Sequence, residues 1–86
     1  MPYGRVLVGL PAARVIARYR RRVGFSQERL AAEAGIDRSH VGGMERRGVD
    51  LRLSTMNALL VALGCTWAEF GAALDAELAP TPRRRW

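Results

Sequence analysis

Glycines divide most of this 86-residue chain into short segments whose apolar residues recur at helical spacing. Gly24, Gly35, Gly48 and Gly64 each follow such a segment. A glycine in this position is typical of a helix C-terminus, because it readily adopts the left-handed conformation that ends many helices. With Pro11 in a first helical turn, the pattern predicts helices over about 11–23, 26–34, 37–47, 54–63 and 66–79. We therefore expect an all-α fold, a compact bundle of five helices.

The predicted core consists of the apolar residues that share one face of each segment. They are Val15, Ile16, Tyr19 and Val23, then Leu30, Ala31 and Ala34, then Val41 and Met44, then Met56, Leu59, Leu60 and Leu63, and finally Trp67, Phe70, Leu74 and Leu78. Ile36 is expected to fill the core between helices. Residues 11–79 are thus the predicted domain, preceded by an arm (1–10) and followed by a flexible tail (80–86).

The charge balance favours a polyanionic partner. The net charge is +6, and every basic residue is an arginine. Arginine binds phosphates and guanine edges in a planar, bidentate manner, although the choice of arginine over lysine could equally reflect genomic base composition. Charge by itself leaves an acidic protein or a membrane surface open as partners.

Several function classes are disfavoured. The one cysteine, Cys65, excludes an internal disulfide or a cysteine-based zinc site. No nucleophile–base pair, paired carboxylates, phosphate loop or metal-ligand spacing is present, so we expect no enzyme, no cofactor and no metal site. Neither a membrane-spanning stretch nor a signal peptide is evident, so we expect a cytoplasmic protein without a membrane partner.

Two short predicted helices meet at Gly35, which is the spacing of a helix-turn-helix between Ser26 and Gly48. Ser26 and Asp37 are suited to cap the two helices. In such a unit the second helix projects far enough to enter a DNA major groove, about 12 Å wide, and the first offers its N-terminus to a phosphate. The segment therefore predicts binding to double-stranded DNA.

Residues 16–70 resemble the lambda-repressor/Cro-like (XRE-type) helix-turn-helix family of transcriptional regulators. The resemblance rests on Ser26-Gln27-x-x-Leu30-Ala31-x-x-Ala34-Gly35-Ile36, with Ile16, Tyr19-Arg20 and Gly24-Phe25 before it. Val41-x-x-Met44-Glu45 and Leu53-x-Thr55-Met56-x-x-Leu59-x-x-Ala62-Leu63-Gly64 follow. It implies a five-helix bundle that binds operator DNA as a dimer.

The resemblance also implies roles for particular residues. Phosphate contacts are expected from Ser26, Gln27, Arg46, Arg47 and Arg52, and base-reading positions at Arg38, Ser39, His40 and Gly43. Arg20 and Glu45 are expected to form a structural ion pair between the first and third helices. The apolar face of the last helix, formed by Trp67, Phe70, Leu74 and Leu78, is expected to form the dimer interface, although part of it could serve the core.

The sequence departs from the family pattern at Gly42-Gly43, in the middle of the predicted recognition helix. Either the glycines let the backbone approach the groove floor, or the helix contacts few bases and affinity comes mainly from phosphates. His40 is either simply exposed or a groove contact. Leu51 stands where the family usually has a proline, in the loop before the fourth predicted helix.

The two ends of the chain are open to several interpretations. The first ten residues could be a minor-groove arm, a strand paired across a dimer, or disordered. Arg83-Arg84-Arg85 could be a solvated end or a phosphate contact.

The function that these observations favour is a sequence-specific transcription regulator, a repressor or autoregulator, that binds a palindromic operator as a homodimer. No small-molecule effector is evident. A restriction–modification controller or an antitoxin-like autorepressor fits the size of the chain. The alternative is a helix-turn-helix bundle that serves mainly as a protein–protein interaction module, with weak DNA specificity, and Gly42-Gly43 is its best support.

Overall fold

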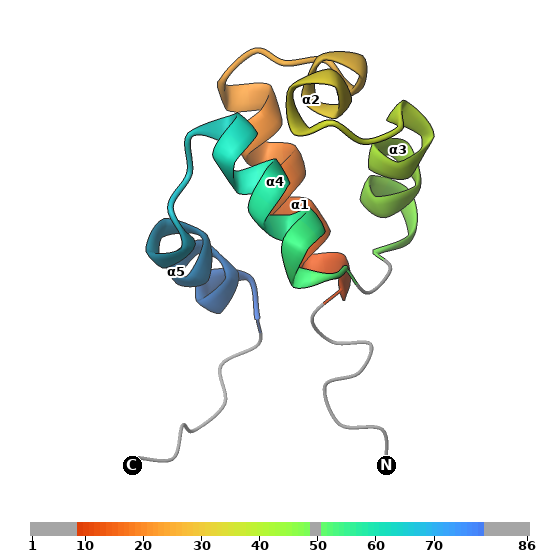
Figure 1. The fold of residues 1–86 in the computed structure, drawn as a ribbon. Coiled ribbons are helices and arrows are strands. Elements are labelled where there is room, and N and C mark those ends of the chain that lie inside the picture. Colours follow the sequence, from red (N-terminus) through yellow and green to blue (C-terminus); the bar gives the residue numbers. More distant parts are fainter. Residues whose placement is uncertain (1–8, 49–50, 79–86) are drawn as a thin grey trace.

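Five helices make up the part of the chain that the computed structural model describes, residues 9–48 and 51–78 (Figure 1). They are α1 (Gly9–Arg22), α2 (Gln27–Ala34), α3 (Arg38–Arg47), α4 (Leu53–Leu63) and α5 (Trp67–Glu77), and these described residues include no strand. The prediction of an all-α, five-helix fold is confirmed.

Helices α1 and α4 lie at the centre of the bundle, with α2 and α3 on one side and α5 on the other (Figure 1). Val15 and Ile16 of α1 and Leu59 and Leu60 of α4 are almost completely buried there. Alanines of α1 add close contacts around them, since Ala12, Ala13 and Ala17 are also buried. Val23, predicted as a core residue, is instead 44% exposed, because α1 ends one residue before it.

The turn between α2 and α3 is fixed by local backbone chemistry. The Ser26 hydroxyl accepts a hydrogen bond from the Arg29 amide at the start of α2. Gly35, with φ of 72°, ends α2 in the left-handed conformation, which residues with a Cβ adopt only at a cost. Leu30 and Ala31 face the core on one side of this turn, and Val41 and Met44 on the other. The two helices are therefore held at a set angle.

The end of α3 contacts the start of α1. A Cβ atom on Gly48 would lie 2.4 Å from the Leu10 Cα atom, closer than real atoms approach, and Gly48 has φ of 61°. Helix α1 begins at Gly9, whereas we expected it to begin at Pro11. Gly9 and Leu10, which we assigned to the arm, therefore belong to the helix. The rest of the predicted arm (1–8), the last residue of the predicted domain (79) and the predicted tail (80–86) lie outside the described residues.

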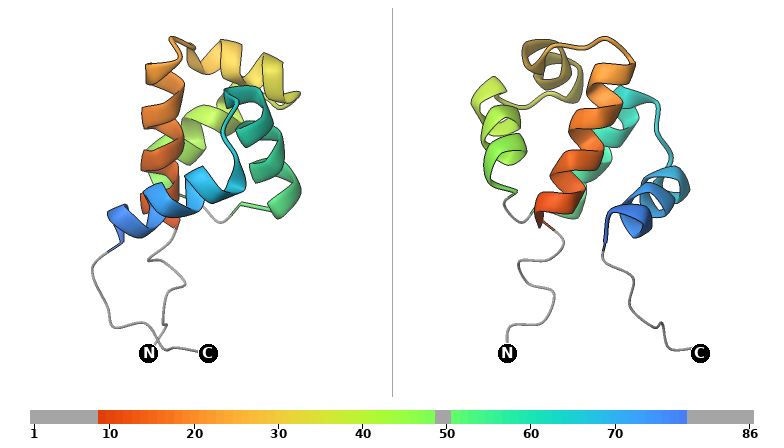
Figure 2. Two further views of the ribbon diagram at one scale, coloured as in Figure 1. Left: turned by 90° about the vertical axis from the view of Figure 1, so that its left-hand side faces the viewer. Right: turned by 180° about the vertical axis from the view of Figure 1, so that it is seen from behind.

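Helix α5 crosses the N-terminal part of α1 (Figure 2). It begins with a capping box, in which the Thr66 hydroxyl accepts from the Glu69 amide and the Glu69 carboxylate accepts from the Thr66 amide. Phe70 anchors the helix in the core, and Glu77 near its end accepts a hydrogen bond from Arg18 of α1. Hydrogen bonds thus stabilise α5 near both of its ends.

A polar network joins α1, α2 and α3. Arg20 Nε lies 2.7 Å from Glu45 Oε2, and Arg20 Nη2 lies 3.1 Å from Oε1 of the same carboxylate. Arg20 Nη1 donates to the Phe25 carbonyl oxygen at 2.7 Å, and Gln27 Nε2 donates to Glu45 Oε1 at 3.0 Å. The side chains of Arg20 and Glu45 are only 12% and 8% exposed. The network therefore holds a charge pair largely out of water, and it fixes α3 against the other two helices.

Burial acts to raise the pKa of Glu45, but the hydrogen bonds from Arg20 and Gln27 and the charges of Arg20 and Arg21 outweigh it and lower that pKa below its usual 4.5. A depressed pKa means that the folded state favours the carboxylate more than the unfolded state does. The resulting stability is present above the usual pKa and is lost as the pH falls through the folded-state value.

We predict that Glu45→Gln lowers the free energy of unfolding by about 3 kcal/mol at pH 7, because the Arg20 charge is left without its partner. The free energy of unfolding of the natural protein should decline as the pH falls below 4.5, and the variant should lose this contribution. Urea denaturation at a series of pH values between about 3 and 7 measures both effects.

Glu33→Gln is the matched control. It removes the carboxylate of the Arg29–Glu33 pair on α2, whose side chains are 58% and 45% exposed. An exposed pair of this kind contributes about 0.5 kcal/mol or less. Equal losses in the two variants would contradict the special role that we assign to Glu45.

Candidate DNA-binding interface

Helix α3 has one face in the core and one face outside it. Val41 and Met44 are buried against the bundle, and Glu45 is turned toward α1. The opposite side carries the exposed polar and basic residues Arg38, Ser39, His40, Arg46 and Arg47. The fold has no use for these side chains in its own packing, so this surface is available to a partner.

Ser26 and Gln27, the pair expected to contact phosphate, lie at the N-terminus of α2. The Ser26 hydroxyl accepts from the backbone of Arg29 at 3.0 Å, which leaves its own proton available for donation. Gln27 is half-buried, and its amide nitrogen donates to Glu45. Gln27 therefore has a structural partner before any ligand arrives, while the positive end of the α2 dipole favours an anion beside it.

Arg38 at the start of α3 lies beside α2. Its Nε atom is 3.2 Å from Glu28 Oε2, and both side chains are largely exposed, at 61% and 66%. An exposed pair in water is weak and exchanges readily for a better acceptor. Glu28 was not expected in this site, because the helix dipole already accounts for an acidic residue in the first turn of α2.

His40, on the outer face of α3, lies close to Arg52 at the start of α4. They line a shallow pocket of about 300 Å³ together with Leu51 and Thr55. Arg52 is the N-cap of α4 but forms no side-chain capping bond, so its guanidinium is not held by the helix that it precedes. The expected base-reading and phosphate-binding residues on this side thus come together around one open hollow.

Gly42 and Gly43 are both buried, although they lie on the outer half of α3. A Cβ atom on Gly42 would meet Arg46 Nη1 and Gln27 Oε1, each at 3.3 Å. A Cβ atom on Gly43 would meet Arg47 Nη2 at 2.8 Å. The backbone at Gly43, expected at a base-reading position, is therefore covered by an arginine rather than open.

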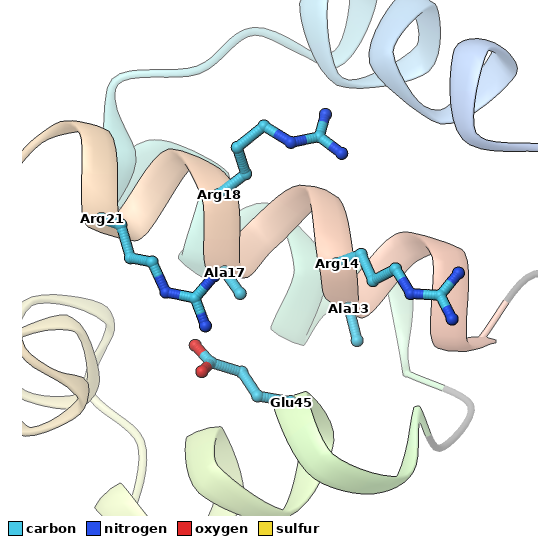
Figure 3. Close-up of a pocket in the computed structure, with 6 residues that line it drawn as sticks. All are labelled: Ala13, Arg14, Ala17, Arg18, Arg21 and Glu45. Atoms are coloured by element: carbon cyan, nitrogen blue, oxygen red, sulfur yellow. The ribbon is translucent and has the colours of Figure 1, made fainter.

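A second hollow of about 290 Å³ lies between α1 and α3. Figure 3 shows Arg21 extending from α1 toward the carboxylate of Glu45, while Arg14 and Arg18 point away from it. Arg18 donates to Glu77 of α5, and Arg14 lies 4.0 Å from the same carboxylate. Arg14 and Arg18 thus share one carboxylate of α5. Arg21, for which no role was expected, adds positive charge behind the α3 surface.

The four residues expected at a dimer interface divide into two groups. Phe70 is 6% exposed in the core, and Leu74 packs against the same core. Leu78 is half-buried. Trp67 is 44% exposed, its ring edge meets Phe70, and its indole nitrogen donates to Asn57 of α4 at 2.9 Å. Val61, one helical turn from Asn57, is 71% exposed. The apolar surface on this side thus includes α4, which the sequence analysis did not foresee.

Two further observations concern other function classes. Within residues 9–48 and 51–78, no three histidine, cysteine, aspartate or glutamate side chains gather where a metal ion would need them. No single described helix has the length and apolar content to span a membrane, and α4 and α5 reach them only when joined across a bend of 104°.

Comparison with known proteins identifies the fold and the family. Residues 16–70 match the helix-turn-helix family model. A hypothetical transcription factor from Neisseria meningitidis serogroup B is 42% identical over 41 residues, which are 48% of this chain and 39% of that protein. The chain thus spans about two-fifths of that relative's length.

Among solved structures, the restriction–modification controller protein C.Esp1396I superimposes with a TM-score of 0.78 at 26% identity, over 81% of this chain and 91% of that one. The same protein bound to a 25 base-pair operator site also gives 0.78 at 26% identity, over 81% and 92%. The helix-turn-helix expected from Ser26 to Gly48 is thus present, and the chain belongs to the helix-turn-helix family of DNA-binding regulators, with a fold of the lambda-repressor-like type.

Proposed function

We propose that this protein is a sequence-specific transcription regulator, a repressor or autoregulator, that binds a palindromic operator in double-stranded DNA as a homodimer and acts in the cytoplasm. The observation that carries the proposal is the outer face of α3. Its exposed polar and basic residues serve no packing role, while Arg20, Glu45 and Gln27 hold the helix rigidly from behind. A rigid helix with an unused basic face suits insertion into a major groove.

The proposed contacts divide by position along the unit. Ser26 and Gln27 at the α2 N-terminus would donate hydrogen bonds to phosphates. Arg46, near the end of α3, and Arg52, after it, would neutralise phosphates, and together these contacts would set the register of the helix on the duplex. Arg38, Ser39 and His40, near the N-terminus of α3, would meet base edges. Since the Arg38–Glu28 pair is exposed, a guanine edge can replace Glu28 at little cost.

The likeness to C.Esp1396I supports an operator as the ligand, because that protein has been solved as a tetramer on its natural 35 base-pair operator. A protein–protein interaction module remains the second candidate function. The glycine pair favoured that candidate, but two arginine side chains cover the glycines, so the face is cationic rather than bare. A cationic face suits DNA better than an apolar protein groove.

We predict that selection from a random pool of duplexes at about 150 mM salt enriches a palindrome. Its half-sites should lie about 10 base pairs apart, or a multiple of that, because a two-fold symmetric pair of α3 helices then enters successive grooves on one side of the duplex. Sequencing of the bound pool measures the enrichment. A bound pool without any shared palindrome would contradict the operator proposal.

Paired variants refine the assignment of roles. Arg38→Ala should relax the preference at one base pair of each half-site, whereas Arg52→Ala should weaken all sequences alike and reduce the salt dependence of binding. Identical behaviour of the two variants would contradict the division between base and phosphate contacts.

The dimer contact proposed here centres on Trp67 and the neighbouring face of α4. Asn57, which accepts the hydrogen bond from Trp67, and Val61 follow each other at one helical turn, so the three side chains form one surface. Val61 and Trp67 expose apolar area that the monomer leaves uncovered. Phe70, Leu74 and Leu78 would support this surface from beneath.

We predict that Val61→Glu converts a dimer into a monomer, because a charge would have to be desolvated at the contact. Sedimentation velocity measures the change, and the thermal midpoint should move little because Val61 is exposed. Ala32→Glu adds the same side chain at an exposed position of α2 and should leave the dimer intact. A Val61→Glu protein that remains dimeric would exclude this surface.

A further inference from the structure

Each of the two glycines in α3 lies one turn before an arginine. Gly42 precedes Arg46 by four residues, and Gly43 precedes Arg47 by four. Side chains in a helix tilt toward its N-terminus, so residue i+4 lies over residue i. The sequence thus places a long guanidinium side chain directly above each position that has no side chain of its own.

The distances show how closely Arg47 fills the empty position. From the point where a Cβ atom of residue 43 would lie, Arg47 Nη2 is 2.8 Å away, Cζ 3.5 Å and Nη1 3.9 Å. The guanidinium therefore occupies the space that a short side chain at position 43 would take. Ser39, one turn before Gly43 on the same face, is exposed. The middle of the outer face of α3 accordingly presents the N–H donors of Arg47.

Arg47 differs from the ion-paired arginines in its electrostatic surroundings, as do Arg46 and Arg52. Arg20 is paired with Glu45, Arg29 with Glu33 and Arg38 with Glu28. Among the described residues, no carboxylate oxygen lies within 4.0 Å of the Arg47 guanidinium. Its donors keep their capacity for an outside acceptor, and the O6 and N7 atoms of guanine match a guanidinium in bidentate geometry.

We propose that Arg47 is a specificity-determining residue that contacts a guanine from the place of residue 43, and that Gly43 is the positioning residue that makes room for it. The inference rests on the proposed function and deepens it, since it moves Arg47 from the expected phosphate contacts to the base contacts. It also gives Gly43 a purpose in recognition, because the absence of a side chain at position 43 lets the guanidinium of Arg47 lie in that place.

Gly42 has a different role from Gly43. Its hypothetical Cβ atom would meet Gln27 Oε1 as well as Arg46 Nη1, and Gln27 is bonded to Glu45. A methyl group at position 42 would therefore disturb the contact between α2 and α3. At position 43 the three nearest atoms all belong to the guanidinium of Arg47. Gly43→Ala is thus the cleaner test, because the part that must move is the far end of a flexible side chain.

The experiment compares the full-length protein with Gly43→Ala, Arg47→Ala and the double variant. Fluorescence anisotropy at about 150 mM salt measures binding to the selected operator and to duplexes with each single base-pair change. The natural protein should discriminate at least about tenfold at one G·C pair per half-site that Arg38→Ala leaves unaffected. Arg47→Ala and Gly43→Ala should each lose most of that discrimination, and the double variant should lose no more than Arg47→Ala.

Gly71→Ala is the matched control, since it adds the same methyl group to a helical glycine of α5 that has nothing within 4 Å of the new atom. It should keep the full binding profile. Thermal unfolding supplies the readout that a merely structural role would move. Alanine favours helix over glycine, so Gly43→Ala should unfold at the same temperature as the natural protein or a higher one, despite its altered specificity.

Three results would overturn the inference. If Arg47→Ala weakened every duplex alike and lowered the salt slope by about 0.9, Arg47 would be a phosphate contact. If Gly43→Ala kept full discrimination, position 43 would not direct Arg47. If Gly43→Ala and Arg47→Ala added independently, the two residues would act separately. A natural protein without any sequence preference would instead refute the operator proposal itself, so the two failures are distinguishable.

Discussion

The contact between Arg20 and Glu45 is the interaction on which the proposed DNA-binding unit depends. It joins α1 to α3 with two hydrogen bonds, and the same arginine and carboxylate reach Phe25 and Gln27 at the start of α2. Apolar packing by itself fixes helix positions loosely, because similar side chains can slide past one another. A directional, largely desolvated charge pair allows few geometries, and the cost of leaving either charge unpaired excludes the alternatives.

The glycines of α3 affect both the face that packs against α2 and the exposed outer face. A glycine in a helix interior costs about 1 kcal/mol relative to alanine, so two consecutive glycines destabilise α3 unless each has a compensating role. Gly42 allows Gln27 to approach closely enough to bond to Glu45. Gly43 allows Arg47 to lie flat on the helix. The cost of the two glycines is therefore offset on both faces of α3. On the inner face the contact with α2 is fixed, and on the outer face the N–H donors of Arg47 lie close to the helix.

Local sequence signals predicted the helices well because each signal has a local cause. Ser26 caps α2 as expected, whereas Asp37 stands at the N-cap of α3 without a side-chain capping bond. Gly35, Gly48 and Gly64 end their helices with positive φ. Long-range packing decided what the local signals could not. Helix α1 begins at Gly9, where Leu10 packs on Gly48. Val23 is 44% exposed for a local reason, because α1 ends one residue before it.

The Arg20–Glu45 ion pair implied by the resemblance is present in the structure. For the outer face of α3, the sequence predicted positions but not contacts. The resemblance located Arg38, Ser39 and His40 on the outer side of α3, where they are exposed. It could not show that Arg38 lies beside Glu28, or that Val61 is left in solvent, because those facts depend on how helices pack side by side. The four-residue spacing of Gly43 and Arg47 was visible in the sequence. That the Arg47 guanidinium covers Gly43 could be seen only from the course of the Arg47 side chain in the structure.

The central claim is that the α2–α3 unit, held by Arg20 and Glu45, is the surface that binds DNA. Titration of the isotopically labelled protein with the selected duplex, followed by amide NMR shifts, tests it most directly. The account predicts that the largest shifts fall on residues 26–28, 38–47 and 51–52, with little change along the exposed side of α5. Shifts concentrated on α4 and α5, with α3 unaffected, would contradict it.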